Sequence, residues 1–316
     1  MEEERIFSPC DTTRKNLNRI YCETDVLSEL RLFELSDIVS SLLPVLSELR
    51  SSGLGAYEML SCIGGDVLPN CEKEKDEAFE PFKKILASLS KREREAERAA
   101  FSLLLAGEFL SLGISERDFL VSESRDNSFT YVKNTLADEA YDVFAEEFDD
   151  PRVKYSRDFQ ECARLIASDS VAYALLPFEE RGGTRLNSVS ELIWRYDLKV
   201  NKVTPVFGPD GSADMKYALV SRSFTVPDRS DGDDRYLEIR VSQRSDTEPS
   251  ELLGVFSMLG HSVYRVNTET FRDEGEGETF FSIVVRDDGR DFVSLLVYLT
   301  LFVTDYYPVG IYKNLE

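Results

Sequence analysis

The chain is poor in the residues that most metal and nucleophilic sites require. It has one histidine, His261, and its five cysteines are odd in number and lack paired short spacings. We therefore expect reduced thiols rather than a disulfide framework or a zinc site. No Ser-His-Asp, Walker or GxGxxG pattern occurs. The sequence predicts no metal and no cofactor, and a structural rather than catalytic role for His261.

Basic residues and long apolar runs are also scarce. Lys and Arg number 37 against 59 Asp and Glu, which gives a net charge of -22. A charge of this sign disfavours nucleic acid and anionic membranes as partners. No apolar run is long enough to span a bilayer, and the first residues lack the basic and apolar segments of a signal peptide. We expect a cytoplasmic protein without a nucleic acid or membrane partner.

Apolar residues are nevertheless abundant enough for real cores. A length of 316 residues predicts two or three domains. A hydrophobic content of 42% is enough to give each of them a core. Within residues 1–125, apolar residues recur at helical spacing in two stripes. These stripes are Leu27, Leu30, Phe33, Ile38, Leu42, Leu46 and Leu49, and Ala96, Ala99, Leu103, Leu104 and Leu110. Core packing explains them better than a cofactor or membrane site, so this region is expected to be helical.

Residues 126–226 alternate between strand-like and helix-like patterns. Strand-prone runs occupy residues 129–133, 171–177, 198–203 and 216–221, and helical spacing occupies residues 138–148, 158–168 and 188–196. This rhythm predicts a small parallel or mixed sheet flanked by helices. Ligands bind such sheets at the carboxyl ends of the strands, so the predicted loop after Pro177 is a candidate site.

That segment reads Phe178-Glu-Glu-Arg-Gly-Gly-Thr184. Paired glycines permit a close backbone approach, and an arginine suits an anionic group. The ligand-binding candidates here are Glu179, Glu180, Arg181, Gly182, Gly183 and Thr184. A solvated strand-to-helix turn explains the same residues, since Gly-Gly is an ordinary turn marker.

The stretch from Val171 to Asn187, with the helix and strand that follow, resembles the prephenate dehydratase family without a gap. Of the family's Glu-Asn-Ser motif, Glu179 is retained. Met215-Lys-Tyr217 occupies the place of the family's Thr-Arg-Phe motif, which adds Lys216 and Tyr217 as ligand-binding candidates. Lys216 keeps a cation that can hold a carboxylate. The resemblance implies a carbon–oxygen lyase of phenylalanine biosynthesis.

Two departures from the family pattern weaken the expected activity. The threonine of Thr-Arg-Phe is replaced by Met215, which cannot donate a proton. The chain also runs from Val203 to Met215 through one short connection, where the family inserts a second lobe. Dehydration needs a polarised leaving hydroxyl in a water-poor cleft. Hydroxyls are available on Thr184, Thr204, Ser212 and Tyr217, but no pattern singles one out.

Residues 235–316 predict a plait of βαββαβ order. In this position they resemble the ACT regulatory domain of the dehydratase family, and Glu269 takes the place of the glutamate in its Glu-Ser-Arg-Pro motif. The family's glycine-containing turn corresponds to the region of Ser250, without the glycine. The resemblance implies a homodimer through this domain and makes Glu269 a regulatory candidate.

The order of the regions is similar to bifunctional enzymes in which a chorismate mutase precedes the dehydratase. A mutase must surround a dianion with cations. Candidates are Arg31, Arg50, Lys83, Lys84, Arg92, Arg94 and Arg98. Residues 91–98 alternate in charge, however, which is typical of a solvated helix face.

The sequence thus predicts an α+β multidomain chain. Its parts are a helical region at residues 1–125 whose position resembles that of a chorismate mutase, one truncated α/β lobe of the periplasmic-binding-like type at 126–226, and an ACT-like ferredoxin-like domain at 235–316. The preferred function is a prephenate dehydratase-like protein whose activity is weak or lost. The alternatives are a non-catalytic regulatory protein that binds a small carboxylate or an aromatic amino acid, and a purely structural dimer.

Overall fold

The computed structural model describes residues 29–64, 84, 87–89, 94–120, 126–208, 211, 213–229, 234–245, 247–273 and 276–313. Contacts divide the chain into two compact units. The helical unit comprises Met1–Phe119, Arg244–Val263 and Asp288–Tyr306. The sheet unit comprises Leu120–Gln243, Tyr264–Asp287 and Tyr307–Glu316. That residues 1–125, 126–226 and 235–316 fold as separate domains remains a prediction.

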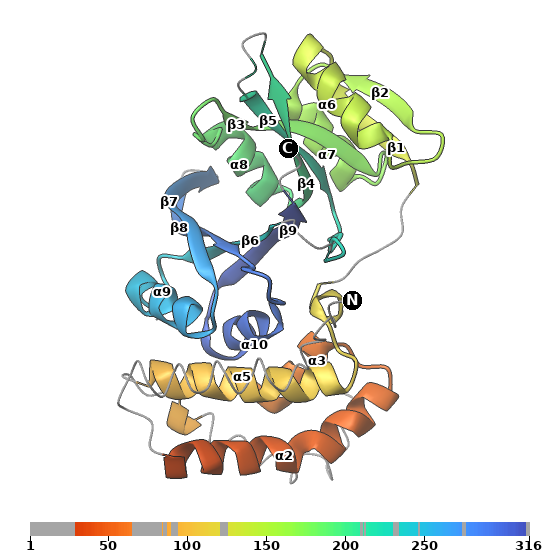
Figure 1. The fold of residues 1–316 in the computed structure, drawn as a ribbon. Coiled ribbons are helices and arrows are strands. Elements are labelled where there is room, and N and C mark those ends of the chain that lie inside the picture. The colour runs from red at the N-terminus through yellow and green to blue at the C-terminus, as the bar shows by residue number, and fades with distance from the viewer. Residues whose placement is uncertain are drawn as a thin grey trace, which may run out of the picture. The chain divides into compact units, whose positions relative to one another are not determined.

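The helical unit contains α2 (Glu29–Ser51), α3 (Ala56–Gly64), α5 (Glu95–Ser111), the short 3-10 helix η1 (Glu116–Asp118), α9 (Pro249–Met258) and α10 (Val293–Phe302). Helix α5 contacts α2, α9 and α10, and Figure 1 shows α2 and α5 side by side. No helix in the described part of the chain is long and apolar enough to cross a membrane.

The apolar stripes of this unit are buried in part. In α2 the buried face is formed by Leu35, Val39, Leu42, Leu46 and Leu49. Phe33, expected in the stripe, is 64% exposed, because it lies off this face of the helix. The sequence predicts an amphipathic helix over residues 292–302, with Leu295, Leu296, Leu299 and Phe302 on its apolar face. In the structure every residue of α10 from Val293 to Leu299 is buried, so the helix is enclosed on all sides.

The first sheet of the sheet unit is mixed, as the sequence predicts. It consists of β1 (Ser128–Val132), β2 (Arg152–Ser156), β3 (Tyr173–Glu180), β4 (Lys199–Phe207) and β5 (Ala213–Ser221) in the order β2-β1-β3-β5-β4. Strand β1 is parallel to β2 and β3, whereas β5 is antiparallel to β3 and β4. Helix α6 (Thr135–Ala145) contributes to the core on one face, and α7 (Phe159–Ala167) and α8 (Asn187–Arg195) to the core on the other.

Two elements differ from the sequence prediction. The edge strand β2 was missed, because its side chains are mostly exposed and give no apolar run. Helix α6 begins at Thr135 rather than Asp138, since the Asn134 side chain caps it by accepting a hydrogen bond from the Ala137 amide at 2.9 Å. The short connection after Val203 is confirmed: β4 returns directly as β5 in an antiparallel pair.

The second sheet contains β6 (Arg235–Ser242), β7 (Ser262–Asp273), β8 (Glu276–Arg286) and β9 (Tyr306–Lys313), in the order β7-β8-β6-β9. With α9 and α10 between them in sequence, these strands have the predicted βαββαβ order. Strand β9 lies against β4 of the first sheet. A Cβ on Gly310 would be 2.0 Å from the carbonyl oxygen of Val200, so the two backbones approach closely there.

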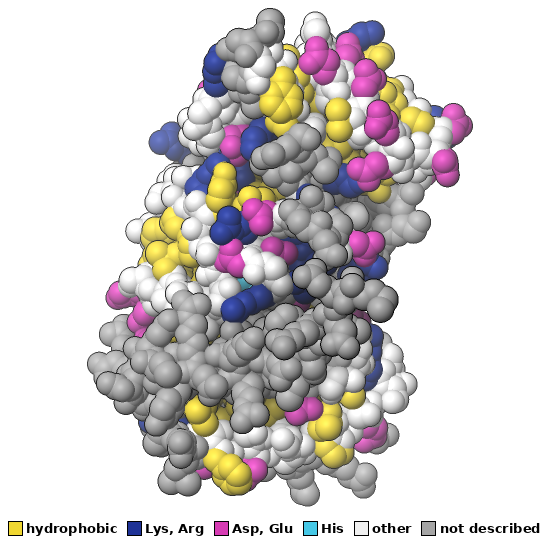
Figure 2. All heavy atoms as spheres, viewed as in Figure 1, with side chains coloured by type: hydrophobic (Ala, Val, Ile, Leu, Met, Phe, Trp, Pro, Cys, Tyr) yellow, Lys and Arg dark blue, Asp and Glu magenta, His cyan; other side chains and the backbone are white. Residues whose placement is uncertain are grey.

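Charge is distributed unevenly over the surface. Figure 2 shows acidic side chains gathered over the region where Figure 1 places α6 and β2. An anionic ligand would be repelled there. An anion site therefore requires a place where cations are concentrated.

Candidate functional site

The predicted loop after Pro177 is the end of a strand followed by a tight turn. Strand β3 continues to Glu180, which pairs with Met215, and a bulge between Pro177 and Glu179 shifts the register. The expectation that this segment is a loop is therefore wrong for residues 178–180. The turn itself needs its glycines, because Gly182 and Gly183 have φ of 90° and 86°.

This turn reverses the chain and brings Arg185 back beside Glu179. The Glu180 amide donates to the Thr184 carbonyl at 2.9 Å, and Glu179 and Arg185 form an isolated bridge. Arg181, the predicted anion ligand, instead lies on the outside of the turn. Its side chain is 60% exposed and lies 3.5 Å from Asp214.

Glu179 is neutralised by two arginines. Its carboxylate accepts two hydrogen bonds from the Arg265 guanidinium, at 2.9 and 3.1 Å, and lies 3.6 Å from Arg185 Nε. The side chain of Glu179 is 9% exposed. The hydrogen bonds that Arg265 donates to Glu179 raise the pKa of Arg265, although partial burial opposes this effect.

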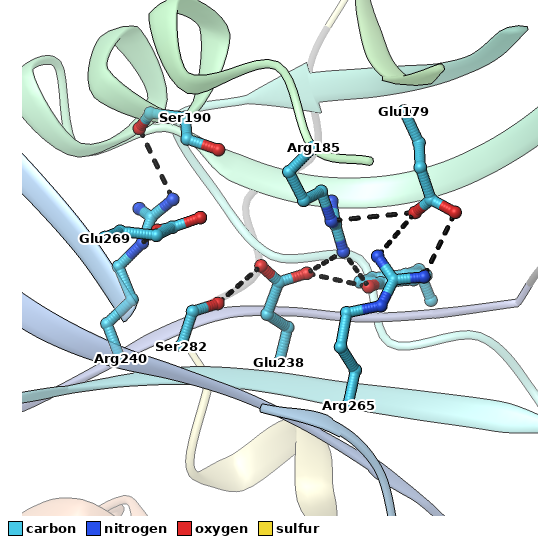
Figure 3. A network of polar contacts seen from close by, with 9 residues as sticks. Glu179, Arg185, Ser190, Glu238, Arg240, Arg265, Glu269 and Ser282 are labelled. Atoms are coloured by element: carbon cyan, nitrogen blue, oxygen red, sulfur yellow. Dashed lines mark hydrogen bonds and ion pairs between the residues drawn. The ribbon is translucent and has the colours of Figure 1, made fainter. Parts of the chain in front are cut away.

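Arg185 connects this pair to the second sheet, as Figure 3 shows. Its Nη2 donates to Glu238 at 2.8 Å and to the Tyr312 hydroxyl at 3.1 Å. Its guanidinium carbon lies 3.5 Å from the centre of the Phe178 ring. Burial alone would lower the pKa of Arg185, but Glu238 and Glu179 outweigh it and the pKa is raised. Arg185 is therefore charged, buried and held from three sides.

Glu238 is the buried acceptor of the network. Tyr312 donates to it at 2.7 Å and Ser282 at 3.4 Å. Burial would raise the pKa of Glu238, but Arg185 and Arg240 outweigh it and lower the pKa. Burial, and then the charge of Glu238, raise the pKa of Tyr312 well above 10, so its hydroxyl keeps its proton.

The lowered pKa of Glu238 predicts a dependence of stability on acid. The folded-state pKa lies below the usual value of 4.5, so Glu238 contributes stability above that pH, and the contribution is lost as the pH falls through the folded-state pKa. In Glu238→Gln, the slope of unfolding free energy against pH below 4.5 should be shallower by up to one proton, or about 1.4 kcal/mol per pH unit. Urea unfolding at several pH values measures both slopes. Equal slopes would contradict the assignment.

Glu269, the regulatory candidate, belongs to a second buried pair. It accepts a hydrogen bond from Arg240 Nε at 2.9 Å, and Arg240 also donates to the Ser190 carbonyl at 3.3 Å. The Glu269 and Arg240 side chains are 4% and 3% exposed. Arg240 lies 5.0 Å from the Phe271 ring centre, and Phe271 stacks on Trp194. The structure thus places Glu269 in a core ion pair.

Lys216 lies directly opposite Glu179 on the neighbouring strand β5. Both line a cavity of about 20 Å³ together with Arg185 and Arg265, and the aromatic wall includes Tyr264. Among the described residues, no carboxylate or other hydrogen-bonding group contacts the Lys216 side chain. The structure therefore brings together two of the predicted candidates, Glu179 and Lys216. Of the three cations that line the cavity, Lys216 is the one that forms no ion pair with a described carboxylate.

The other candidates lie apart from this cavity. Tyr217 faces the opposite side of β5, where it belongs to the core beneath α6 and its hydroxyl lies 3.4 Å from Asn134. Thr204 pairs with Tyr217 in register and is 2% exposed. Glu180 and Thr184 are exposed at the turn. Ser212 lies outside the described residues.

The arginines proposed for a mutase site form hydrogen bonds or ion pairs where the structure describes them, whereas Lys84 is exposed. Arg31 lies 2.8 Å from Glu97, and Arg50 lies 2.7 Å from Asp118. Arg98 is 8% exposed rather than solvated, because its Nε donates to the Leu89 carbonyl at 2.6 Å. Lys83 and Arg92 lie outside the described residues. The described arginines serve as structural partners.

No protein-family model matches the chain, and no curated protein matches it. Among solved structures it is similar to the prephenate dehydratase of Streptococcus mutans, with a TM-score of 0.48, 14% identity, and 60% of this chain and 99% of the other covered. A quorum-quenching acylase is similar with a TM-score of 0.42 and 18% identity, and the match covers 59% of this chain and 93% of the acylase. The prephenate dehydratase of Arthrobacter aurescens in complex with L-Phe is similar with a TM-score of 0.42 and 13% identity, and the match covers 58% of this chain and 89% of the dehydratase. These comparisons assign no family, so function has to be inferred from the chain's own residues.

Proposed function

We propose that this chain is a prephenate dehydratase-like protein that has lost dehydration and binds a small carboxylate beside Lys216. The observation that carries the proposal is the charge of the cluster. Arg185, Arg265 and Lys216 face two carboxylates, Glu179 and Glu238, which leaves one positive charge. One net charge suits a ligand with one carboxylate, such as an aromatic amino acid or its keto acid, better than the dianion prephenate.

The same geometry argues against turnover. The direct return of β4 as β5 leaves this lobe without an opposing lobe to exclude water. The Tyr312 hydroxyl is bound to Glu238, and its raised pKa makes it a poor proton donor. Tyr264 is 53% exposed, and Thr204 and Tyr217 face the other side of the sheet. None of these hydroxyls is placed to protonate a leaving group in a dry site.

A ligand panel tests the binding proposal. The melting temperature should rise with phenylalanine, tyrosine or phenylpyruvate, because a ligand at about 100 times its Kd stabilises the folded state by about 2.7 kcal/mol. Lys216→Ala should abolish this rise. Lys154→Ala is the matched control, since it removes the same charge from an exposed position of β2. Prephenate and chorismate complete the panel.

Two outcomes would contradict the proposal. If no carboxylate raises the melting temperature of the wild-type chain, the binding role is wrong. If phenylpyruvate forms from prephenate at high protein concentration, and Lys216→Ala stops it, the chain is an enzyme. The homodimer through residues 235–316, proposed from the ACT-like element order, remains a prediction for sedimentation.

A further inference from the structure

Arg185 has one donor that the ion-pair network leaves unused. Its side chain is 7% exposed, and Nη1 is buried without a hydrogen-bond acceptor in the part of the chain that the structure describes. Leaving a buried charged donor unsatisfied is costly, so such groups normally have an acceptor. Arg185 lines the cavity beside Lys216. The cavity is thus where the missing acceptor can lie.

The cavity favours an acceptor with a negative charge. Lys216 and Arg185 both contribute cations, while Glu179 is already held by Arg265. Phe178, Val203 and Val284 supply apolar walls, and such a wall lowers the local dielectric and strengthens a charge interaction. A neutral water would leave the positive charge of the cluster uncompensated.

The size of the cavity limits the occupant. A volume of about 20 Å³ holds one atom of the size of a water oxygen, because about 10–15 Å³ is the minimum for one water. We infer that Arg185 Nη1 and Lys216 Nζ form a monoanion subsite that takes one atom-sized negative group. This group is a halide ion or one oxygen of a ligand carboxylate. The binding of a ligand carboxylate rests on the proposed function, whereas the binding of a halide ion does not.

The test compares anions of different size at equal ionic strength. The melting temperature of the full chain is measured in sodium chloride, sodium bromide and sodium tetrafluoroborate, since tetrafluoroborate is a larger, weakly coordinating anion that carries no carboxylate oxygen. The melting temperature in chloride and in bromide should exceed that in tetrafluoroborate by about 2 °C or more. The difference should vanish in Lys216→Met and persist in Lys154→Met. In bromide-soaked crystals, the anomalous signal should lie between Arg185 and Lys216.

The outcomes separate this inference from the proposed function. No difference between halide and tetrafluoroborate in the wild-type chain, or an equal difference in Lys216→Met, would show that water fills the cavity and would overturn the subsite. Arg185→Lys gives a second test that keeps the charge: it should weaken the halide effect by removing Nη1. If organic carboxylates raise the melting temperature and chloride does not compete with them, the binding role stands and the subsite is wrong.

Discussion

Replacing Arg185 by alanine should lower the free energy of unfolding by about 3–5 kcal/mol, because it removes one partner from a buried charge network. Without the guanidinium, Glu238 loses the hydrogen bond at 2.8 Å and keeps Tyr312 and Ser282 as its donors. Phe178 loses the cation stacked on its ring. Urea denaturation monitored by circular dichroism measures the change.

Arg181→Ala is the matched control for this variant. It makes the same substitution four residues earlier, on a side chain that is 60% exposed, and should cost about 0–1 kcal/mol. A loss of less than 1 kcal/mol for Arg185→Ala would mean that the network contributes little. Similar losses for both variants would mean that the turn, rather than the buried charge, is responsible.

A methyl group at Gly310 should destabilise the sheet unit by about 1–3 kcal/mol or more. The added Cβ would be 2.0 Å from the Val200 carbonyl oxygen, and both partners are backbone, so no side chain can rotate away. Strands β9 and β4 would have to separate. Val309 and Tyr312, which share a core with Val200, would lose part of their packing. The melting temperature of Gly310→Ala reports this cost.

Gly254→Ala provides a contrasting control. Gly254 lies within α9, and no described heavy atom lies within 4 Å of its added Cβ. Alanine there should stabilise the chain by about 0.5–1 kcal/mol, since it favours the helix. If Gly310→Ala were equally stabilising, the close approach of β9 and β4 would be refuted.

Much of the secondary structure could be predicted because it is encoded locally. The apolar runs at residues 171–177 and 216–221 predict the central strands β3 and β5, and helical spacing predicts α7 and α8. Strand β2 could not be predicted, since an exposed edge strand needs no apolar pattern. The extent of burial around α10 depends on its neighbours and is not visible in the sequence.

The candidate site could be predicted only in part, because its partners are distant in sequence. Glu179 and Lys216 were both singled out and lie opposite each other. Arg265 is 86 residues from Glu179, and Tyr312 is 127 residues from Arg185. Local reasoning selected Arg181 for its place before the glycines. The turn at those glycines instead buries Arg185, which no local pattern distinguishes.

The ion pairs and hydrogen bonds of Arg185 and Arg265 connect segments that are remote along the chain: β3 with its turn, β6, β7 and β9. Opening any one of these segments breaks charge contacts made by the others. The sheet unit should therefore open as one cooperative foldon, in which amides of β3 and β9 exchange with deuterium at a common rate. Removal of the last strand by a carboxypeptidase would expose the amides of β3 as well.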